Sequence, residues 1–168
     1  MQLTSFIQLP TESLWDFSLA LYAQPGVADC CLHLQDEHGV NVNVLLWCVW
    51  LGARGYELDQ AQLDEALDSI QGWDSRYVQP LRALRRQMKL EFGVKDEDVE
   101  AVRTSIKQAE LQAERQLQLW LEQRVDSRET SSKGGRQIVS KNIQIYLLSL
   151  GMMSQVITRV DEQINSQL

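Results

Sequence analysis

No run of apolar residues in the sequence is long enough to cross a membrane as a helix. The longest covers ten residues, from Val44 to Ala53, whereas a membrane-spanning helix needs about 20. The first ten residues hold neither a basic stretch nor an extended apolar one, so they do not resemble a secretory signal. We therefore expect a soluble protein that stays in the cytoplasm and has no membrane partner.

Cysteine and positive charge are also scarce. Cys30, Cys31 and Cys48 are an odd set with two adjacent members, which makes a poor disulfide framework, and we expect three free thiols. Lysine and arginine number 16 against 23 acidic residues, which leaves a net charge of −7. Since a surface that binds phosphate is normally cationic, this balance makes nucleic acid an unfavoured partner.

The short motifs of common catalytic sites are missing. There is no glycine-rich phosphate-binding loop, no nucleophile elbow and no paired-histidine zinc motif. Asp29, His33 and Glu37 share one helical face, but a single histidine among acids is the composition of a solvated polar face. Cys30 lies three residues before His33, yet no second pair or orienting acid completes a site. We predict no catalytic, cofactor-binding or metal-binding residue, and we favour a protein that is not an enzyme.

Apolar residues recur at helical spacing along the chain, and no segment alternates as a half-buried strand does. The predicted fold class is all-α, with a compact bundle of about five helices in a body formed by residues 1–93. Gly72 is expected to end the fourth helix, and Asn41 can cap the third. That third helix is apolar on nearly every side, so we place it at the centre of the core. The expected helices of the body cover 12–23, 27–38, 42–53, 60–71 and 74–92.

Residues 94–168 are expected to form a long two-helix hairpin that packs on the body as one unit. Its first helix covers about 96–125, with an apolar seam of coiled-coil-like spacing. Its second covers about 140–166, where the apolar positions alternate by three and four without a gap. The polar stretch 126–139 between the two helices is expected to be a mobile loop.

The second of these helices has more apolar surface than a two-helix hairpin buries. Gly151 lies within it and is expected to weaken the helix without breaking it. The surplus must contact the body or a partner, and a homodimer through the C-terminal helices is one form of such contact. The surplus stripe is Leu147, Leu148, Met152 and Val156.

Charge changes sharply between two neighbouring helices of the body. Residues 57–74 carry six acids and no base, whereas 75–90 carry five bases and no acid. One interpretation is that the bases pair with the adjacent acidic helix. The other is a docking site for phosphate, RNA or an acidic partner, since the planar guanidinium suits such groups. The bases that form one stripe on the helix are Arg82, Arg85, Arg86 and Lys89.

Polar residues also meet at the turn between the second and third expected helices. Their simplest role is loop capping, and the alternative is a small polar pocket in an enzyme or ligand-binding protein. A concave site at this turn would favour the pocket. The residues are Gln35, Asp36, Asn41 and Asn43.

The segment 14–52, together with Trp73 and the run PLRALRRQMK from Pro80, resembles an uncharacterised proteobacterial family catalogued as domain of unknown function 2390. The resemblance covers roughly residues 12–90. Asn41 stands where the family usually has aspartate, which keeps the capping ability but removes a charge. The family has no assigned activity, so the resemblance implies a Gram-negative cytoplasmic origin and no residue roles. The matching motifs are Trp15-Asp16-Phe17, Leu34-Gln35-Asp36 and Val42-Asn43.

These features together favour a non-enzymatic helical module that works by protein association. Its expected partner is another protein or a second copy of the chain. Two alternatives stay open. One is a small enzyme or ligand-binding protein that uses the 35–43 pocket, and the other is a protein that contacts RNA or the ribosome through the 82–89 stripe.

Overall fold

The apolar stretch 42–53 is the central helix, α3 (Val42–Ala53), in the computed structural model, which describes residues 12–124 and 135–168. Every residue of α3 after Val42 is buried, because its side chains are apolar on all sides of the helix. The side chain of Asn41 caps its N-terminus and accepts the main-chain N–H of Asn43 at 3.0 Å. Both the predicted cap and the central position of this helix are confirmed.

All regular secondary structure in the described residues is helical, which confirms the predicted fold class. No helix in these two ranges combines the length and the apolar character needed to cross a membrane. The elements besides α3 are α1 (Leu14–Tyr22), α2 (Val27–His38), α4 (Gln60–Trp73), the π-helix η1 (Asp74–Val78), α5 (Gln79–Phe92), α6 (Glu97–Gln123), α7 (Arg136–Ser149) and α8 (Ser154–Asn165).

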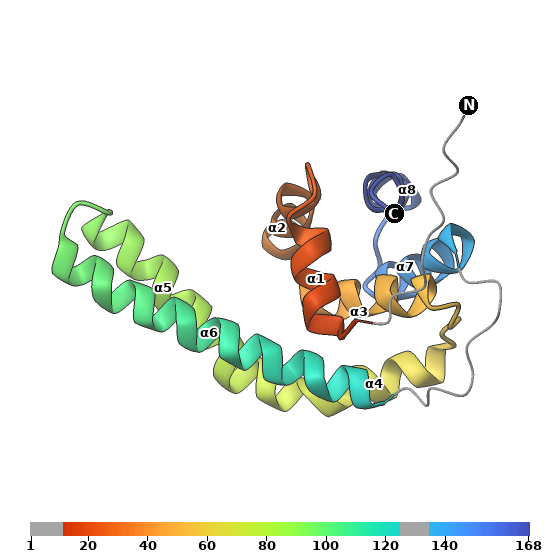
Figure 1. The fold of residues 1–168 in the computed structure, drawn as a ribbon, viewed down its shortest axis with the longest axis horizontal. Helices are drawn as coiled ribbons and strands as arrows, with labels where there is room; N and C mark the ends of the chain where they lie inside the picture. Colours follow the sequence, from red (N-terminus) through yellow and green to blue (C-terminus); the bar gives the residue numbers. More distant parts are fainter. Residues whose placement is uncertain (1–11, 125–134) are drawn as a thin grey trace.

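Helices α1, α2, α6 and α7 pack around α3, and α8 covers α7 and α2 (Figure 1). The approach of α3 to α7 is so close that it depends on a glycine. A Cβ atom on Gly52 would lie 2.5 Å from the Cα atom of Val139. The missing side chain therefore lets the two helices pack backbone against backbone.

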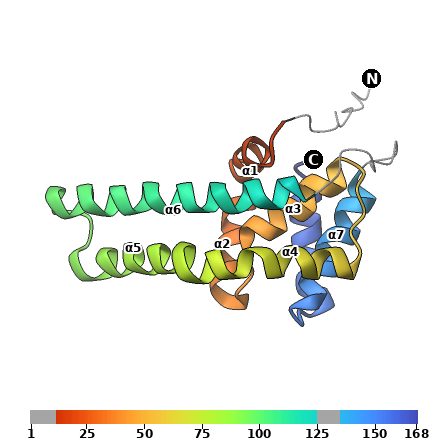
Figure 2. The ribbon, with the colours of Figure 1, turned by 90° about the horizontal axis from the view of Figure 1, so that it is seen from below.

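A long hairpin extends from this body. The segments α4, η1 and α5 form one continuous helical rod, and α6 runs back beside it in the opposite direction (Figure 2). The expectation that α6 pairs with the C-terminal helix is wrong. Only residues 93–96 separate α5 from α6, and so short a connection makes α6 return along α5. Residue 93, expected to end the body, lies in the turn of this hairpin.

The rod continues past two residues that were expected to interrupt it. Gly72 does not end a helix, because α4 runs through it to Trp73 and directly into η1. At the end of η1 the N–H of Gln79 donates to the carbonyl of Asp74, five residues back. This wider turn lets the helix pass Pro80, which has no N–H to donate. The predicted helical span 74–92 is therefore confirmed, with a π turn at its start.

The segment predicted as one helix over 140–166 is two helices, α7 and α8. Gly151 lies between them with a φ of 73°, so it ends the helix rather than weakening it. Because α8 folds back over α7 and α2, the chain itself covers much of the surplus apolar stripe. Leu147 and Met152 are buried, whereas Leu148 is half exposed. Two of the four stripe residues are therefore buried inside the chain, while Leu148 and, in part, Val156 stay accessible.

The predicted loop over 126–139 falls mostly on residues that the structure does not describe. Helix α7 already begins at Arg136, so the last four residues of that stretch are helical. Residues 125–134 lie outside the described part of the chain, and the loop stays a prediction there.

Candidate functional site

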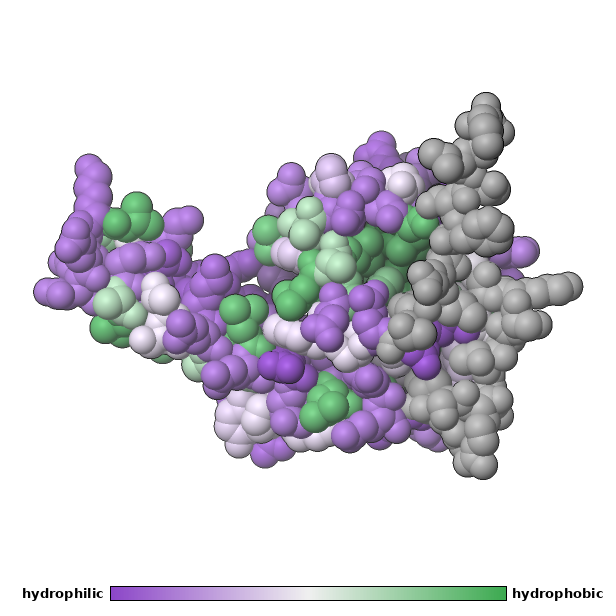
Figure 3. All heavy atoms as spheres, in the orientation of Figure 1, coloured by the Kyte–Doolittle hydropathy of each residue, from purple (hydrophilic) through white to green (hydrophobic). Residues whose placement is uncertain are grey.

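The outer part of the long hairpin, formed by α5, the turn 93–96 and residues 97–110 of α6, is called the arm below. It extends away from the body (Figures 1 and 2), and α5 packs mainly against α6 and η1. None of the 14 residues of α5 is buried, because no third element covers the helix pair. Near the free end of the arm, Figure 3 shows separate apolar patches with hydrophilic side chains between them. The large apolar residues left exposed on the arm are Leu84, Leu90, Phe92, Val94 and Val102.

A groove with a volume of about 240 Å³ lies where the arm leaves the body, and we call it the base groove. Leu19, Leu32 and Leu111 line it and are themselves exposed. Its other lining residues include cations: Arg85, Arg86 and Lys107. The base groove therefore combines an apolar lining with cations, of which Arg85 and Arg86 are paired with acids and Lys107 forms no ion pair among the described residues.

Two of the three stripe arginines are bound to carboxylates on α6. Arg82 Nε donates to Glu110 Oε1 at 3.1 Å and also contacts Glu114, while Arg85 makes a two-pronged contact with Glu110. The expected pairing with the acidic helix 57–74 is wrong, because α4 and α5 belong to the same rod and cannot face each other. The acids that do pair are four residues apart on one face of α6, a spacing that could have identified them.

The pKa values of the two carboxylates in this cluster, Glu110 and Glu114, are shifted in opposite directions. Burial alone would raise the pKa of Glu110, but hydrogen bonds and charges from Arg85 and Arg82 outweigh burial and hold that pKa below its ordinary value. Burial raises the pKa of Glu114 above its ordinary value despite its contact with Arg82. Glu110 is therefore the anion that fixes α5 against α6.

Glu110→Gln is expected to lower the free energy of unfolding at neutral pH by about 1–2 kcal/mol, the range for a hydrogen bond to a charged partner. Because the folded pKa of Glu110 lies below the ordinary value of 4.5, its contribution is present above that pH and is lost as the pH falls through the folded pKa. The difference between variant and wild type, measured by urea unfolding at several pH values, should therefore shrink below about pH 4.5. Glu65→Gln, on an exposed position of α4, is the control, and a pH-independent difference would contradict the assignment.

The remaining stripe residues are more accessible. Arg86 forms an ion pair with Asp36 of α2 at 2.8 Å, and both side chains are partly exposed. The hydrogen bond from Arg86 lowers the pKa of Asp36. Lys89 is exposed near the end of α5. With Arg82 and Arg85 already neutralised, the stripe offers less charge to RNA than the sequence alone indicates.

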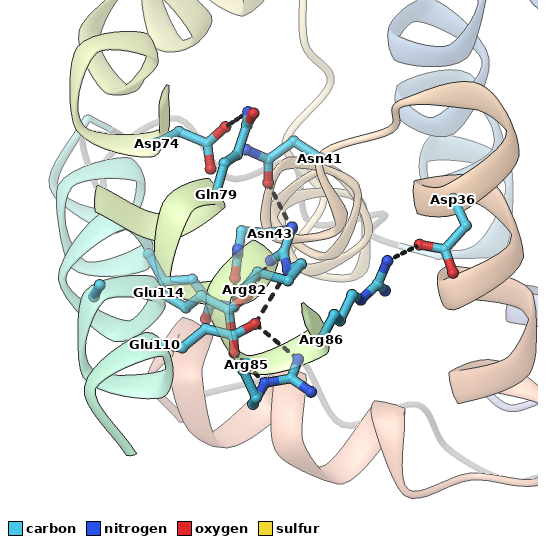
Figure 4. Close-up of polar contacts among 12 residues, drawn as sticks. Asp36, Asn41, Asn43, Asp74, Gln79, Arg82, Arg85, Arg86, Glu110 and Glu114 are labelled. Atoms are coloured by element: carbon cyan, nitrogen blue, oxygen red, sulfur yellow. Dashed lines mark hydrogen bonds and ion pairs between the residues drawn. The ribbon is translucent and has the colours of Figure 1, made fainter. Parts of the chain in front are cut away.

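A second hollow, which we call the polar cleft, has a volume of about 450 Å³ and opens between the α2–α3 turn and the rod (Figure 4). A hollow therefore lies at this turn, which is the observation that favours the pocket alternative over loop capping alone. The cleft also brings together two sets of residues that are far apart in the sequence, because Arg82 and Arg86 of the stripe line the wall opposite the turn. The polar side chains that line it are Gln35, Asp36 and Asn41 from the turn, and Asp74, Gln79, Arg82 and Arg86 from the rod.

Asn43 is the one predicted pocket residue that does not line the polar cleft. Its side chain is buried and accepts a hydrogen bond from Gln118 Nε2 at 2.9 Å, and Gln118 in turn accepts one from Ser18. Asn43 therefore joins α3 to α6 and α1. Asn41 reaches the cleft, but its side chain is the cap of α3, so the capping interpretation holds for that side chain.

The cysteines and histidines contribute no activated group. Burial raises the pKa of the Cys30 thiol and raises that of Cys31 to about 12, so both remain neutral thiols near neutral pH. The His33 ring lies edge-on to that of His38, with 5.8 Å between ring centres. Over residues 12–124 and 135–168, no group of three or more histidine, cysteine or acidic side chains is arranged to hold a metal ion.

One family model matches the chain. It is described as "Protein of unknown function (DUF2390)" and covers residues 13–121. The match extends past the 12–90 range of the sequence resemblance and through most of α6, so it includes the whole arm and both walls of the polar cleft. Helices α7 and α8 lie outside it. No curated protein and no solved structure matches the chain.

Proposed function

Because the chain belongs to the DUF2390 family of proteins of unknown function, membership brings no activity with it, and we propose that the protein is a non-enzymatic association module. The proposed contact surface is the arm. This proposal keeps the class of function that the sequence favours and moves its surface from the C-terminal helices to α5 and α6.

The exposed apolar side chains of the arm are the observation that carries the proposal. No residue of α5 is buried, and Leu90, near its end, is 87% exposed. Scattered single apolar residues are ordinary on a protein surface, but several gathered on one projecting element are typical of a contact surface. A two-helix layer also leaves each helix half uncovered, and a further layer would bury the rest.

We propose that a second copy of the chain provides this layer. Two antiparallel helix pairs that pack face to face form a four-helix bundle, in which each pair covers the apolar seam of the other. A two-fold axis makes such a contact self-complementary, because each copy receives the same surface that it offers.

Charge supports an antiparallel arrangement of the two arms. Residues 91–100, at the free end, carry five acids and one base, whereas Lys107, which forms no ion pair among the described residues, lines the base groove. In antiparallel arms the acidic end of one copy meets Lys107 in the base groove of the other, and Leu90 meets the apolar lining of that groove. The 14 residues of α5 span about 21 Å, a short overlap, so we expect a dissociation constant in roughly the micromolar range.

Sedimentation equilibrium tests the proposal. The mass of the wild type is expected to rise from 19.3 kDa towards twice that value as the concentration increases to about 1 mM, and added salt should weaken the rise. The double variant Leu90→Ser, Phe92→Ser is expected to weaken the dimer by at least about tenfold, because each copy loses two apolar contacts. Both side chains are exposed, so the fold should be unaffected.

Leu148→Ser is the matched control, because Leu148 is a half-exposed leucine on α7, outside the arm. It should leave the dissociation constant unchanged. The mass of a single chain at every concentration would overturn the proposal. So would a dimer that Leu148→Ser disrupts and the arm variant does not, since that result would place the contact on the C-terminal helices.

A further inference from the structure

The polar cleft is lined by a buried carboxylate that has no cationic partner among the described residues. The side chain of Asp74 accepts one hydrogen bond, from Gln79 Nε2 at 2.6 Å (Figure 4). Asp74 as a whole is only 9% exposed, and it lines the cleft. In the described ranges, no lysine, arginine or histidine forms an ion pair with it. A buried carboxylate has more acceptor capacity than one amide can satisfy, and its charge is costly to bury without a counterion.

The π turn explains how Asp74 comes to this position. Because the helix widens over η1, Gln79 lies one turn after Asp74, and its main chain and side chain both bond to that residue. A π turn is less favourable than an α turn and is often found where a helix places a functional side chain. The carboxylate is thus held in a fixed orientation at the wall of the cleft.

The other charges around the cleft are already balanced. Arg82 contacts Glu110 and Glu114, and Arg86 pairs with Asp36. The charge of Asp74 is therefore the one that a ligand would neutralise. The cleft volume of about 450 Å³ is in the range of small-molecule sites, so the cleft is large enough to admit a small cation.

We propose that the polar cleft binds a small organic molecule through a primary ammonium group, with Asp74 as its anchor. Three N–H donors of an ammonium match the free acceptor positions of the carboxylate. The source of the ammonium is either a plain amine or an amino acid, whose carboxylate would have to compete with Asp36 for Arg86, another residue that lines the cleft. This proposal does not depend on association through the arm.

Calorimetric titration of the full-length protein with lysine and with cadaverine, which is lysine without its carboxylate, tests the proposal. At least one is expected to bind, and Asp74→Asn should weaken that binding by at least about tenfold. Tighter binding of lysine identifies the amino acid as the source, whereas equal or tighter binding of cadaverine identifies the plain amine. The control Asp68→Asn removes the same charge from an exposed position on α4 and should change nothing.

A second variant tests the proposal without changing Asp74, so the test does not depend on whether Asp74→Asn folds. Ala83 is an exposed residue of α5 that lines the cleft, so Ala83→Phe fills the cleft without touching the core and should also prevent binding. The absence of binding by both probes at millimolar concentration would overturn the proposal. Equal weakening by Asp68→Asn and Asp74→Asn would overturn it as well, because it would mean that the cations bind the acidic surface in general.

Discussion

Gly52→Ala is expected to lower the free energy of unfolding by about 3 kcal/mol, at the upper end of the range for overpacking a core. The new Cβ atom would lie 2.5 Å from Cα and 2.6 Å from the N of Val139. Because both are backbone atoms, no side-chain rotation relieves the contact, and α7 must move away from α3. For a chain of this length the loss corresponds to a melting temperature lower by roughly 6–12 °C.

Gly72→Ala makes the same chemical change, but we do not expect it to lower the free energy of unfolding. Gly72 also lies inside a helix, but there the nearest atom to a new Cβ is the end of the flexible Arg76 side chain. Alanine is favoured over glycine in a helix by about 1 kcal/mol, so this variant is expected to be neutral or slightly more stable. Urea unfolding of the two variants beside the wild type checks the pair. A loss of less than about 1 kcal/mol for Gly52→Ala would show that α3 and α7 do not depend on backbone contact.

Periodicity predicts which face of a helix is buried but not which element covers it, and the fold illustrates both halves of that rule. The apolar helix 42–53 could be placed at the core because all its faces are apolar. The seam of α6 could not be assigned in the same way, since the C-terminal helix and α5 present similar apolar stripes. The deciding fact was the four-residue turn between α5 and α6, which depends on distance along the chain and not on periodicity.

The polar cleft was predictable in its parts and not in its assembly. The arginine stripe follows from helical spacing, and the polar turn follows from adjacency in sequence. Asp36 and Arg86 are 50 positions apart, and nothing in a single sequence indicates that they meet at 2.8 Å. Asp74 was missed because it ends an acidic stretch, where a solvated side chain is the ordinary expectation. Its burial results from the π turn, whose one sequence signal is Pro80.

Asn142→Ala is the second substitution for which a large loss of stability is expected, about 3–4 kcal/mol, because several buried hydrogen bonds depend on one side chain. Asn142 is fully buried on α7. Its Oδ1 accepts the main-chain N–H of Leu58 at 2.9 Å, while its Nδ2 donates to the carbonyls of Cys48 and Tyr56. This one amide therefore fixes the connection between α3 and α4 to the C-terminal part of the chain. Alanine would leave the N–H of Leu58 without its acceptor in the interior.

Gln144→Ala, two residues along the same helix but exposed, separates this effect from helix propensity and should change stability by less than about 0.5 kcal/mol.

The comparison also tests whether α7 and α8, which lie outside the matched family range 13–121, form one cooperative unit with the matched part. If they do, Asn142→Ala lowers the midpoint of a single unfolding transition seen by tryptophan fluorescence, since all five tryptophans precede residue 121. If the C-terminal helices unfold independently, circular dichroism will show an early transition that the tryptophans do not report. In that case Asn142 stabilises only the contact between the two parts, and not the core around α3.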